Sequence, residues 1–140
     1  YFSYLKKFYK TLQSKEFCNN ISKLFSGKYN LSCFSITSSI VYGGSTLFPH
    51  VDDIAISHDA KLEAESMINC IFFIYANPNQ TSSGGTGIYK DNEFNSAIFE
   101  PKNLVNTLLI YKTDKRKFHG FREVPKNSLR YAVTAQYNQK

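Results

Sequence analysis

The stretch at residues 67–75 constrains the fold more than any other part of the sequence. It reads MINCIFFIY, is almost wholly apolar and is rich in isoleucine and aromatic residues, which favour strands. A run this short and apolar predicts a central strand covered on both faces. Because side chains alternate along a strand, one face would carry Ile68, Cys70, Phe72 and Ile74, and the other Asn69, Ile71, Phe73 and Tyr75.

Further strand-like segments lie on both sides of this stretch, separated by turn clusters. We expect strands at 31–42, 46–52, 85–89, 94–100, 107–112, 118–124 and 129–137. Apolar residues at three- and four-residue spacing predict one helix in the first dozen residues and another over 14–25, ended by Gly27. Eight short strands in two sheets make a jelly roll. The expected fold is therefore mainly β, a double-stranded β-helix (jelly roll, cupin-like) with N-terminal helices packed on one sheet.

The chain has 140 residues and no visible linker, which predicts a single domain over 1–140. Its helical lead-in would cover about 1–26 and its jelly-roll core about 31–138. No apolar run is long enough to span a bilayer and no signal-peptide pattern opens the chain, so we expect no membrane partner. Three scattered cysteines, Cys18, Cys33 and Cys70, indicate reduced thiols and a cytoplasmic protein.

The net charge of +6 permits an acidic partner such as nucleic acid and weakly favours an acidic substrate. The lysines gather only at 6–10 and 112–117. A solvated helix face and a solvated loop explain these two clusters at least as well. A basic nucleic-acid-binding β-domain therefore stays the weaker interpretation.

The pair His50 and Asp52 is the first candidate for chemistry. In a strand these side chains project from one face, where an imidazole and a carboxylate can take two adjacent positions around a metal ion. A surface histidine beside a solvated aspartate explains the pair equally simply. The candidate third ligand is His119, in Phe118-His119-Gly120-Phe121, whereas His58 lies in a polar segment and would be solvated.

Arg130, in the last expected strand, is a candidate anion anchor. A simple hairpin centred on the 126–127 turn would pair His119 with Thr134 and Glu123 with Arg130, all on one face. Arg130 would then lie roughly 13 Å along from the point opposite His119. A five-carbon dicarboxylate held by the metal at one end could reach an arginine there, whose planar fork suits a carboxylate. A shift of one residue would turn Arg130 away, and a surface arginine in an edge strand is the plain alternative.

Together these features resemble the 2-oxoglutarate/Fe(II)-dependent oxygenases, and within them the prolyl-hydroxylase-like branch. The resemblance spans residues 42–137. It rests on Tyr42-Gly43-Gly44, Pro49-His50-Val51-Asp52, Phe73-Ile74-Tyr75-Ala76-Asn77, Gly84-Gly85-Thr86-Gly87-Ile88-Tyr89, Phe99-Glu100-Pro101, Phe118-His119-Gly120 and Leu129-Arg130-Tyr131-Ala132-Val133-Thr134. Two positions depart from the family: Ala132 stands where some relatives have serine, and Asn103 where a turn glycine is usual. Asparagine tolerates the left-handed conformation that such a turn needs.

The resemblance implies a dioxygenase that hydroxylates or oxidatively demethylates a substrate and releases succinate and CO2. His50, Asp52 and His119 would bind Fe(II), and Arg130 would hold 2-oxoglutarate. Further contacts to this cosubstrate would come from Tyr42, Tyr75, Asn69 and Thr134. Dioxygen would be the second cosubstrate, with ascorbate as an optional reductant.

The prime substrate is not readable, and a peptide prolyl residue, a free amino acid, a nucleobase or a small metabolite fits equally. A cupin-like jelly roll that binds a metal or small ligand without oxygenase activity would use the same triad. An inward-facing Arg130 separates the two interpretations, because without it nothing would anchor a dicarboxylate.

Overall fold

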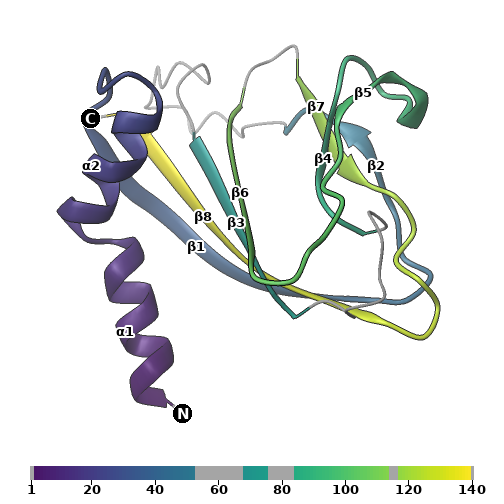
Figure 1. Ribbon diagram of the computed structural model, residues 1–140, viewed down its shortest axis with the longest axis horizontal. Coiled ribbons are helices and arrows are strands. Elements are labelled where there is room, and N and C mark those ends of the chain that lie inside the picture. Colours follow the sequence, from purple (N-terminus) through teal and green to yellow (C-terminus); the bar gives the residue numbers. More distant parts are fainter. Residues whose placement is uncertain (1, 53–67, 76–83, 114–116, 140) are drawn as a thin grey trace, which may run out of the picture.

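Two four-stranded antiparallel sheets face each other, and two helices lie against one of them (Figure 1). This computed structural model describes residues 2–52, 68–75, 84–113 and 117–139. The side chains of Phe2 and Tyr75 also fall outside the description. The predictions for His58, for the polar segment 57–66 and for the loops at 77–83 and 114–116 therefore lie outside the described residues.

The strands pair in the pattern of a jelly roll. One sheet, here the major sheet, has the order β1-β8-β3-β6, made of β1 (Leu31–Tyr42), β8 (Leu129–Gln139), β3 (Ile68–Tyr75) and β6 (Thr107–Lys112). The minor sheet has the order β2-β7-β4-β5, made of β2 (Leu47–His50), β7 (Phe118–Phe121), β4 (Gly87–Tyr89) and β5 (Ala97–Phe99). The first strand pairs with the eighth, the second with the seventh, the third with the sixth and the fourth with the fifth. Such an antiparallel ribbon coiled into two sheets confirms the expected fold class.

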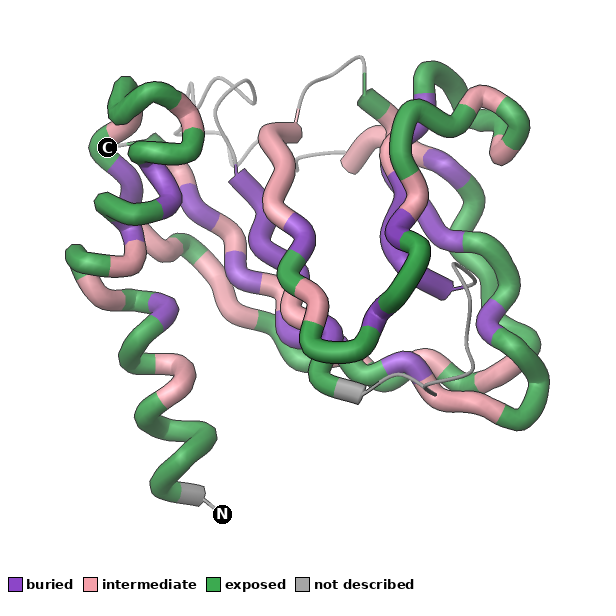
Figure 2. Tube along the Cα trace, viewed as in Figure 1, coloured by how far each residue is buried: buried purple, intermediate pink, exposed green. Residues whose placement is uncertain are grey.

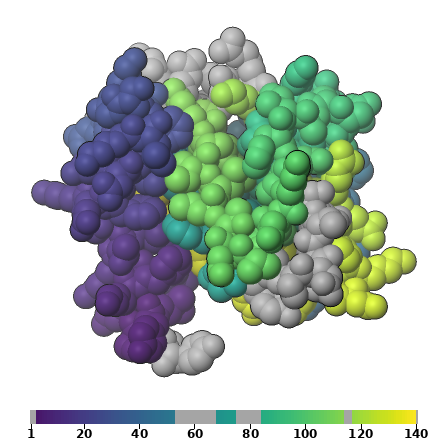
Figure 3. Space-filling model, in the orientation of Figure 1, coloured from purple at the N-terminus to yellow at the C-terminus, as the bar shows by residue number. Residues whose placement is uncertain are grey.

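The helices α1 (Phe2–Leu12) and α2 (Lys15–Leu24) cover the outer face of the major sheet, as predicted. Ser14 caps α2, its Oγ accepting a hydrogen bond from the Phe17 amide at 3.1 Å, and the chain leaves the helix through Gly27 at φ +67°, which glycine adopts without strain. Figure 3 shows both helices, purple to dark blue, along one flank of the molecule. Neither of these described helices is long and apolar enough to cross a membrane.

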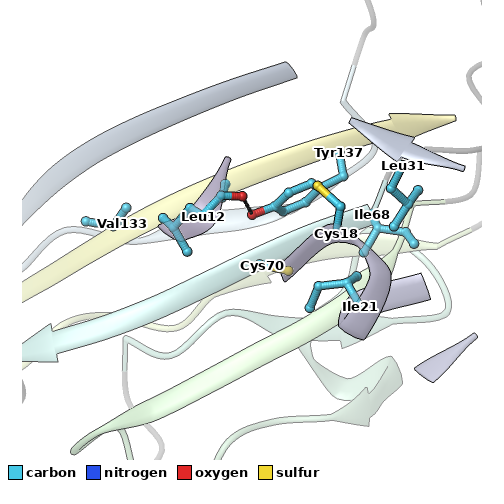
Figure 4. Packing of buried hydrophobic residues seen from close by; sticks show 9 residues of the cluster. Leu12, Cys18, Ile21, Leu31, Ile68, Cys70, Val133 and Tyr137 are labelled. Carbon is cyan, nitrogen blue, oxygen red and sulfur yellow. Dashed lines mark hydrogen bonds between the residues drawn. The ribbon is translucent and has the colours of Figure 1, made fainter. Parts of the chain in front are cut away.

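The strand β3 shows the predicted alternation. Ile68 and Cys70 are fully buried against α1 and α2, in the cluster that Figure 4 draws. Ile71 and Phe73 belong to a second cluster on the opposite face. The burial of β3 ends near the end of the strand, where Ile74 is 54% exposed. Figure 2 shows β3 as buried along most of its length.

Two details around β5 differ from prediction. Of the strand expected over 94–100, only Ala97–Phe99 is extended, because Phe94–Ser96 forms a 3-10 turn. Local bonds hold this turn: the amide and the Oγ of Ser96 both donate to the Glu93 carbonyl. In the turn after Pro101, Asn106 rather than Asn103 adopts a positive φ, 49°. Asn103 instead accepts the Val105 amide with its side chain, at 2.8 Å.

The predicted hairpin of the last two strands is wrong. The turn after Pro125 exists, with the Ser128 amide donating to the Pro125 carbonyl, but β7 and β8 lie in different sheets. The connection between them runs beside the connection from β1 to β2, where the Val124 amide donates to the Ser45 carbonyl at 2.8 Å. Both connections cross between the sheets together, because β8 pairs with β1 and β7 pairs with β2.

Candidate metal centre

Three side chains with metal-ligating atoms meet at one end of the minor sheet. His50 and His119 are cross-strand neighbours in the pairing of β2 with β7, and Asp52 lies two residues beyond the end of β2. The Asp52 Oδ1 lies 3.4 Å from His50 Nε2 and 3.3 Å from His119 Nε2. One ligating atom from each residue lies within 4.8 Å of the other two. This is the donor set of a 2-His-1-carboxylate metal site.

The backbone orients the imidazole of His50. Its Nδ1 lies 2.9 Å from the Phe48 carbonyl oxygen. A carbonyl only accepts, so Nδ1 carries a proton, and in the neutral imidazole Nε2, which faces Asp52, then has the free lone pair. Such a bond on the far ring nitrogen fixes both the tautomer and the direction of a ligating histidine.

The electrostatics of the triad favour an ionised carboxylate. The hydrogen bond from His119 holds the pKa of Asp52 below its usual range, against the opposing effect of burial, and both imidazoles add to the lowering. The side chains of His50 and Asp52 are 37% and 38% exposed, and that of His119 is 11% exposed. The triad is thus anchored on β7 and open to solvent on the side of His50 and Asp52.

A cavity of about 220 Å³ runs from the triad between the two sheets. The inner face of the major sheet contributes Asn69, Tyr111, Arg130 and Thr134 to its lining, and the minor sheet contributes Phe121. Pockets for drug-sized ligands measure about 300–1,000 Å³. The cavity therefore suits a molecule of only a few carbon atoms.

Arg130 is buried in this cavity, with 6% of its surface exposed, and β8 is a central strand rather than an edge. Its Nη2 donates to Thr86 Oγ1 at 2.9 Å. The guanidinium carbon lies 5.2 Å and 4.6 Å from the ring centroids of Phe73 and Phe121, a cation–π arrangement. Burial lowers the pKa of Arg130 to about 10, so the group stays cationic at neutral pH.

The residues present fit an anionic ligand. No ion pair joins Arg130 to a carboxylate among the described residues. Within these same residues its buried Nε also has no hydrogen-bond acceptor. A buried cation without a counter-ion is costly, and a carboxylate from a ligand would remove that cost. The three ligating side chains, which also line the cavity, fit a divalent metal ion of the iron, nickel or zinc type.

The structure brings six of the eight predicted site residues to one cavity: His50, Asp52, Asn69, His119, Arg130 and Thr134. It does not bring Tyr42 there. Tyr42 is 66% exposed and follows Ser38 and Ile40 on the outer face of β1, where Ser38 bonds Tyr9 of α1. The backbone of Tyr75 ends β3, and its side chain lies outside the described residues.

The reason for the proximity of His119 and Arg130 differs from the predicted one. His119 pairs with His50 and Ile88 in the minor sheet. Thr134 pairs with Thr37 and Ile71 in the major sheet. The two groups thus face each other across the space between sheets rather than along one hairpin.

Sequence reasoning missed Thr86 and Tyr111 as lining residues. Thr86 carries no signal of its own within Gly84-Gly85-Thr86-Gly87, although it is the hydrogen-bond acceptor of Arg130. Tyr111 is the cross-strand neighbour of Asn69, so the pairing of β3 with β6 would have placed it on the inner face. That pairing joins segments far apart in the sequence, and no local pattern reveals it.

Comparisons with known proteins give matches among solved structures alone: no protein-family model and no curated protein matches this chain. A prolyl hydroxylase of Trichoplax adhaerens, in complex with a hypoxia-inducible-factor peptide fragment, matches over 85% of this chain and 53% of its own, at 20% identity and TM-score 0.54. The non-heme monooxygenase ThoJ, as its nickel complex, matches over 85% and 48%, at 14% identity and TM-score 0.56. HygX of Streptomyces hygroscopicus, with nickel and 2-oxoglutarate bound, matches over 91% and 68%, at 11% identity and TM-score 0.58.

These likenesses confirm the fold expected from the resemblance. The chain spans about half the length of the prolyl hydroxylase and of ThoJ. At 11–20% identity the shared property is the double-stranded β-helix. Fold alone does not define an activity, so the function has to be argued from the cavity.

Proposed function

We propose that this chain is a single 2-oxoglutarate- and Fe(II)-dependent dioxygenase domain. One observation carries the proposal: a buried arginine, with no acidic partner in the part of the chain that the structure describes, shares a small cavity with two histidines and an aspartate. The triad and the arginine together would hold the two ends of a short dicarboxylate. A metal-binding jelly roll without oxygenase activity does not need such an arginine. Burying a charged guanidinium away from water lowers stability.

The chain's own residues have distinct roles in this proposal. His50, Asp52 and His119 would hold Fe(II) and leave the remaining positions of the metal open. Arg130 would bind the far carboxylate of 2-oxoglutarate through charge-assisted hydrogen bonds, with Thr134 and Asn69 beside it. The apolar side chains of Ile71 and Phe121 would exclude water from the carbon chain. When bound, iron and 2-oxoglutarate supply an oxidant by decarboxylation of the keto acid, with dioxygen as the other cosubstrate.

Two neighbours support this assignment. HygX has been seen with nickel and 2-oxoglutarate bound, and ThoJ is a non-heme monooxygenase seen with nickel. The prolyl hydroxylase was seen with a peptide, and HygX also with hygromycin B. For this chain the proposed substrates accordingly remain a peptide prolyl residue, an amino acid or a small metabolite, hydroxylated or demethylated in the cytoplasm. Ascorbate would serve as an optional reductant.

The cavity gives little support to an acidic prime substrate. Arg130 is the sole arginine or lysine among its lining residues in the described part of the chain. In the proposed function this charge is already used by the cosubstrate. The positive net charge therefore lies elsewhere on the molecule, and nucleic-acid binding has no specific observation in its favour.

The release of labelled CO2 from 2-oxo[1-14C]glutarate tests the proposal, because slow uncoupled decarboxylation needs no prime substrate. We expect release that depends on added Fe(II) and is abolished by Asp52→Ala. The matched control is Asp91→Ala, which removes an exposed carboxylate that accepts the Glu93 amide just before the 3-10 turn and should leave the release intact. Iron-dependent release that survives Asp52→Ala would overturn the assignment of the triad.

A further inference from the structure

Tyr111 lines the cavity beside His119, one of the metal ligands. It lies on β6, and its ring centroid is 5.8 Å from that of His119. Across the major sheet it is the direct neighbour of Asn69, and both line the cavity. Tyr111 therefore lines the same cavity as the triad and Arg130, on the side of His119.

The direction of the Tyr111 hydroxyl is set by Asn69. The Asn69 Nδ2 donates to the Tyr111 oxygen at 3.2 Å. An amide nitrogen only donates, so the phenolic oxygen accepts this bond and its own proton is left for another acceptor. Asn69 is 2% exposed and lies on the central strand β3, where packing leaves it little freedom to turn.

The hydroxyl keeps its proton at neutral pH. The ordinary pKa of a tyrosine is about 10, well above neutral pH. No described residue accepts a hydrogen bond from the Tyr111 hydroxyl. Tyr111 thus offers one donor to whatever occupies the cavity.

We propose that Tyr111 donates a hydrogen bond to the metal-side end of the cosubstrate, and that Asn69 is the positioning residue that fixes this donation. The inference rests on the proposed function. Every polar atom of an ionised 2-oxo dicarboxylic acid is an acceptor, so it can use the donor that Tyr111 presents. Arg130 would hold the far carboxylate, and Tyr111, beside His119, would reach the oxygen atoms at the keto end. The pair makes the site selective for a keto acid over a simple dicarboxylate.

The visible charge-transfer band of the anaerobic Fe(II)–2-oxoglutarate complex reports directly on this bond. A donor to the keto oxygen stabilises the orbital that receives the electron, so loss of the donor moves the band to shorter wavelength. For Tyr111→Phe we expect that shift together with about tenfold weaker binding of 2-oxoglutarate. The control is Tyr29→Phe, whose hydroxyl contacts Lys112 instead of the cavity and whose loss should change neither quantity.

A second variant separates hydrogen bonding from packing. In Asn69→Asp the new carboxylate can only accept, so it would accept a hydrogen bond from the Tyr111 hydroxyl and turn that hydroxyl away from the cavity. The band should then move as in Tyr111→Phe, although the phenol is still present. Band position is the quantity compared, because the added negative charge weakens 2-oxoglutarate binding by itself.

The outcomes distinguish this inference from the proposed function. A normal band in wild type that is unchanged in Tyr111→Phe would overturn the role of Tyr111 and leave the proposed function standing. A band that moves in Tyr111→Phe but not in Asn69→Asp would overturn the positioning role of Asn69. If wild type gives no band, the proposed function itself fails.

Discussion

The two sheets place their functional side chains in opposite environments. In the major sheet, β1 and β8 are 12 and 11 residues long and hold Arg130 at 6% exposure. In the minor sheet, β2 and β7 have four residues each, and the His50 and Asp52 side chains are more than one third exposed. The major sheet is backed by two helices, whereas the ligands of the minor sheet lie at its open end.

This difference suggests a division of roles. A side chain on a long strand that is paired on both sides and covered by helices is held rigidly, which suits the binding of a constant cosubstrate. A metal at the end of short strands can keep open positions accessible to a larger substrate. The substitutions below test whether changes in one sheet leave the binding role of the other sheet unaffected.

The largest effect is expected in the minor sheet from Gly120→Ala. A Cβ at Gly120 would lie 2.5 Å from the Leu47 carbonyl oxygen of β2, too close for any real contact. The substitution would push β2 from β7 and separate His50 from His119. We expect metal affinity to fall by about 10- to 100-fold, the range seen when ligand orientation is lost, in competition titrations against a chromogenic chelator.

Gly85→Ala is the matched control for this change. Its Cβ would also clash, but with side-chain atoms of Pro101 and Leu104, away from the pairing of β2 with β7. It should lower stability and leave the metal affinity of the folded protein unaltered. Equal metal affinity in Gly120→Ala and wild type would show that the triad does not depend on this strand contact.

In the major sheet, Arg130→Met should separate stability from binding. The buried guanidinium has no counter-ion among the described residues, so an apolar side chain of similar length removes a desolvation cost. Without ligand we expect the free energy of unfolding, from urea titration, to stay equal or rise by about 1 kcal/mol. Arg122→Met should instead lower it, since Arg122 donates to Glu100 and to the Phe94 carbonyl. A strongly destabilised Arg130→Met protein would mean that the arginine has a structural role.

The two faces of β8 should also respond separately. Tyr137 is fully buried on the helix side, and its hydroxyl donates to the Leu12 carbonyl at 2.8 Å. Tyr137→Phe should lower the free energy of unfolding by about 1 kcal/mol, the typical loss for one buried hydrogen bond. We expect the dissociation constant for 2-oxoglutarate to stay within about twofold. A large change in that constant would show that the helix-facing side controls the cavity.

The smallest effect is the pH dependence contributed by Asp52. Its pKa is lowered in the folded, metal-free protein, so its stabilising contribution is present above its ordinary pKa of about 3.9 and is lost as pH falls through the folded value. In urea titrations without metal, Asp52→Asn should be less stable at neutral pH, and the difference should shrink below about pH 4. The difference will be modest, because the Asp52 side chain is 38% exposed and solvent screens such charges. A difference that grows on acidification contradicts the shift.

Whether a feature could be predicted depends on how far apart in the sequence the residues that determine it lie. The strand character of β3, the faces of Ile68 and Phe73 and the start of α2 at Ser14 depend on near neighbours, and the structure agrees with them. The approach of His50 to Asp52 is equally local. The sequence also offers His119 as the third ligand, but only the pairing of β2 with β7 shows how it approaches them.

The features that were missed depend on pairing between distant segments. The 126–127 turn looks like a hairpin turn, but pairing with β1 and β2 directs the flanking strands into separate sheets. Tyr42 has the right sequence context, yet alternation along β1 turns it to the outer face. Thr86 became recognisable only through its bond to Arg130. Local signals determine which way a side chain points within a strand, but not which strand faces it.

The central claim is that the triad and Arg130 hold the two ends of one dicarboxylate. An anaerobic titration of Fe(II)-loaded protein, followed through the visible band, tests it with 2-oxoglutarate and with pyruvate, a keto acid that lacks the far carboxylate. We predict that Arg130→Met weakens 2-oxoglutarate binding by about 100-fold, as the loss of charge-assisted hydrogen bonds requires. Pyruvate binding should be unchanged, and Arg122→Met should behave as wild type with both acids. Equal binding of 2-oxoglutarate to wild type and Arg130→Met would contradict the claim.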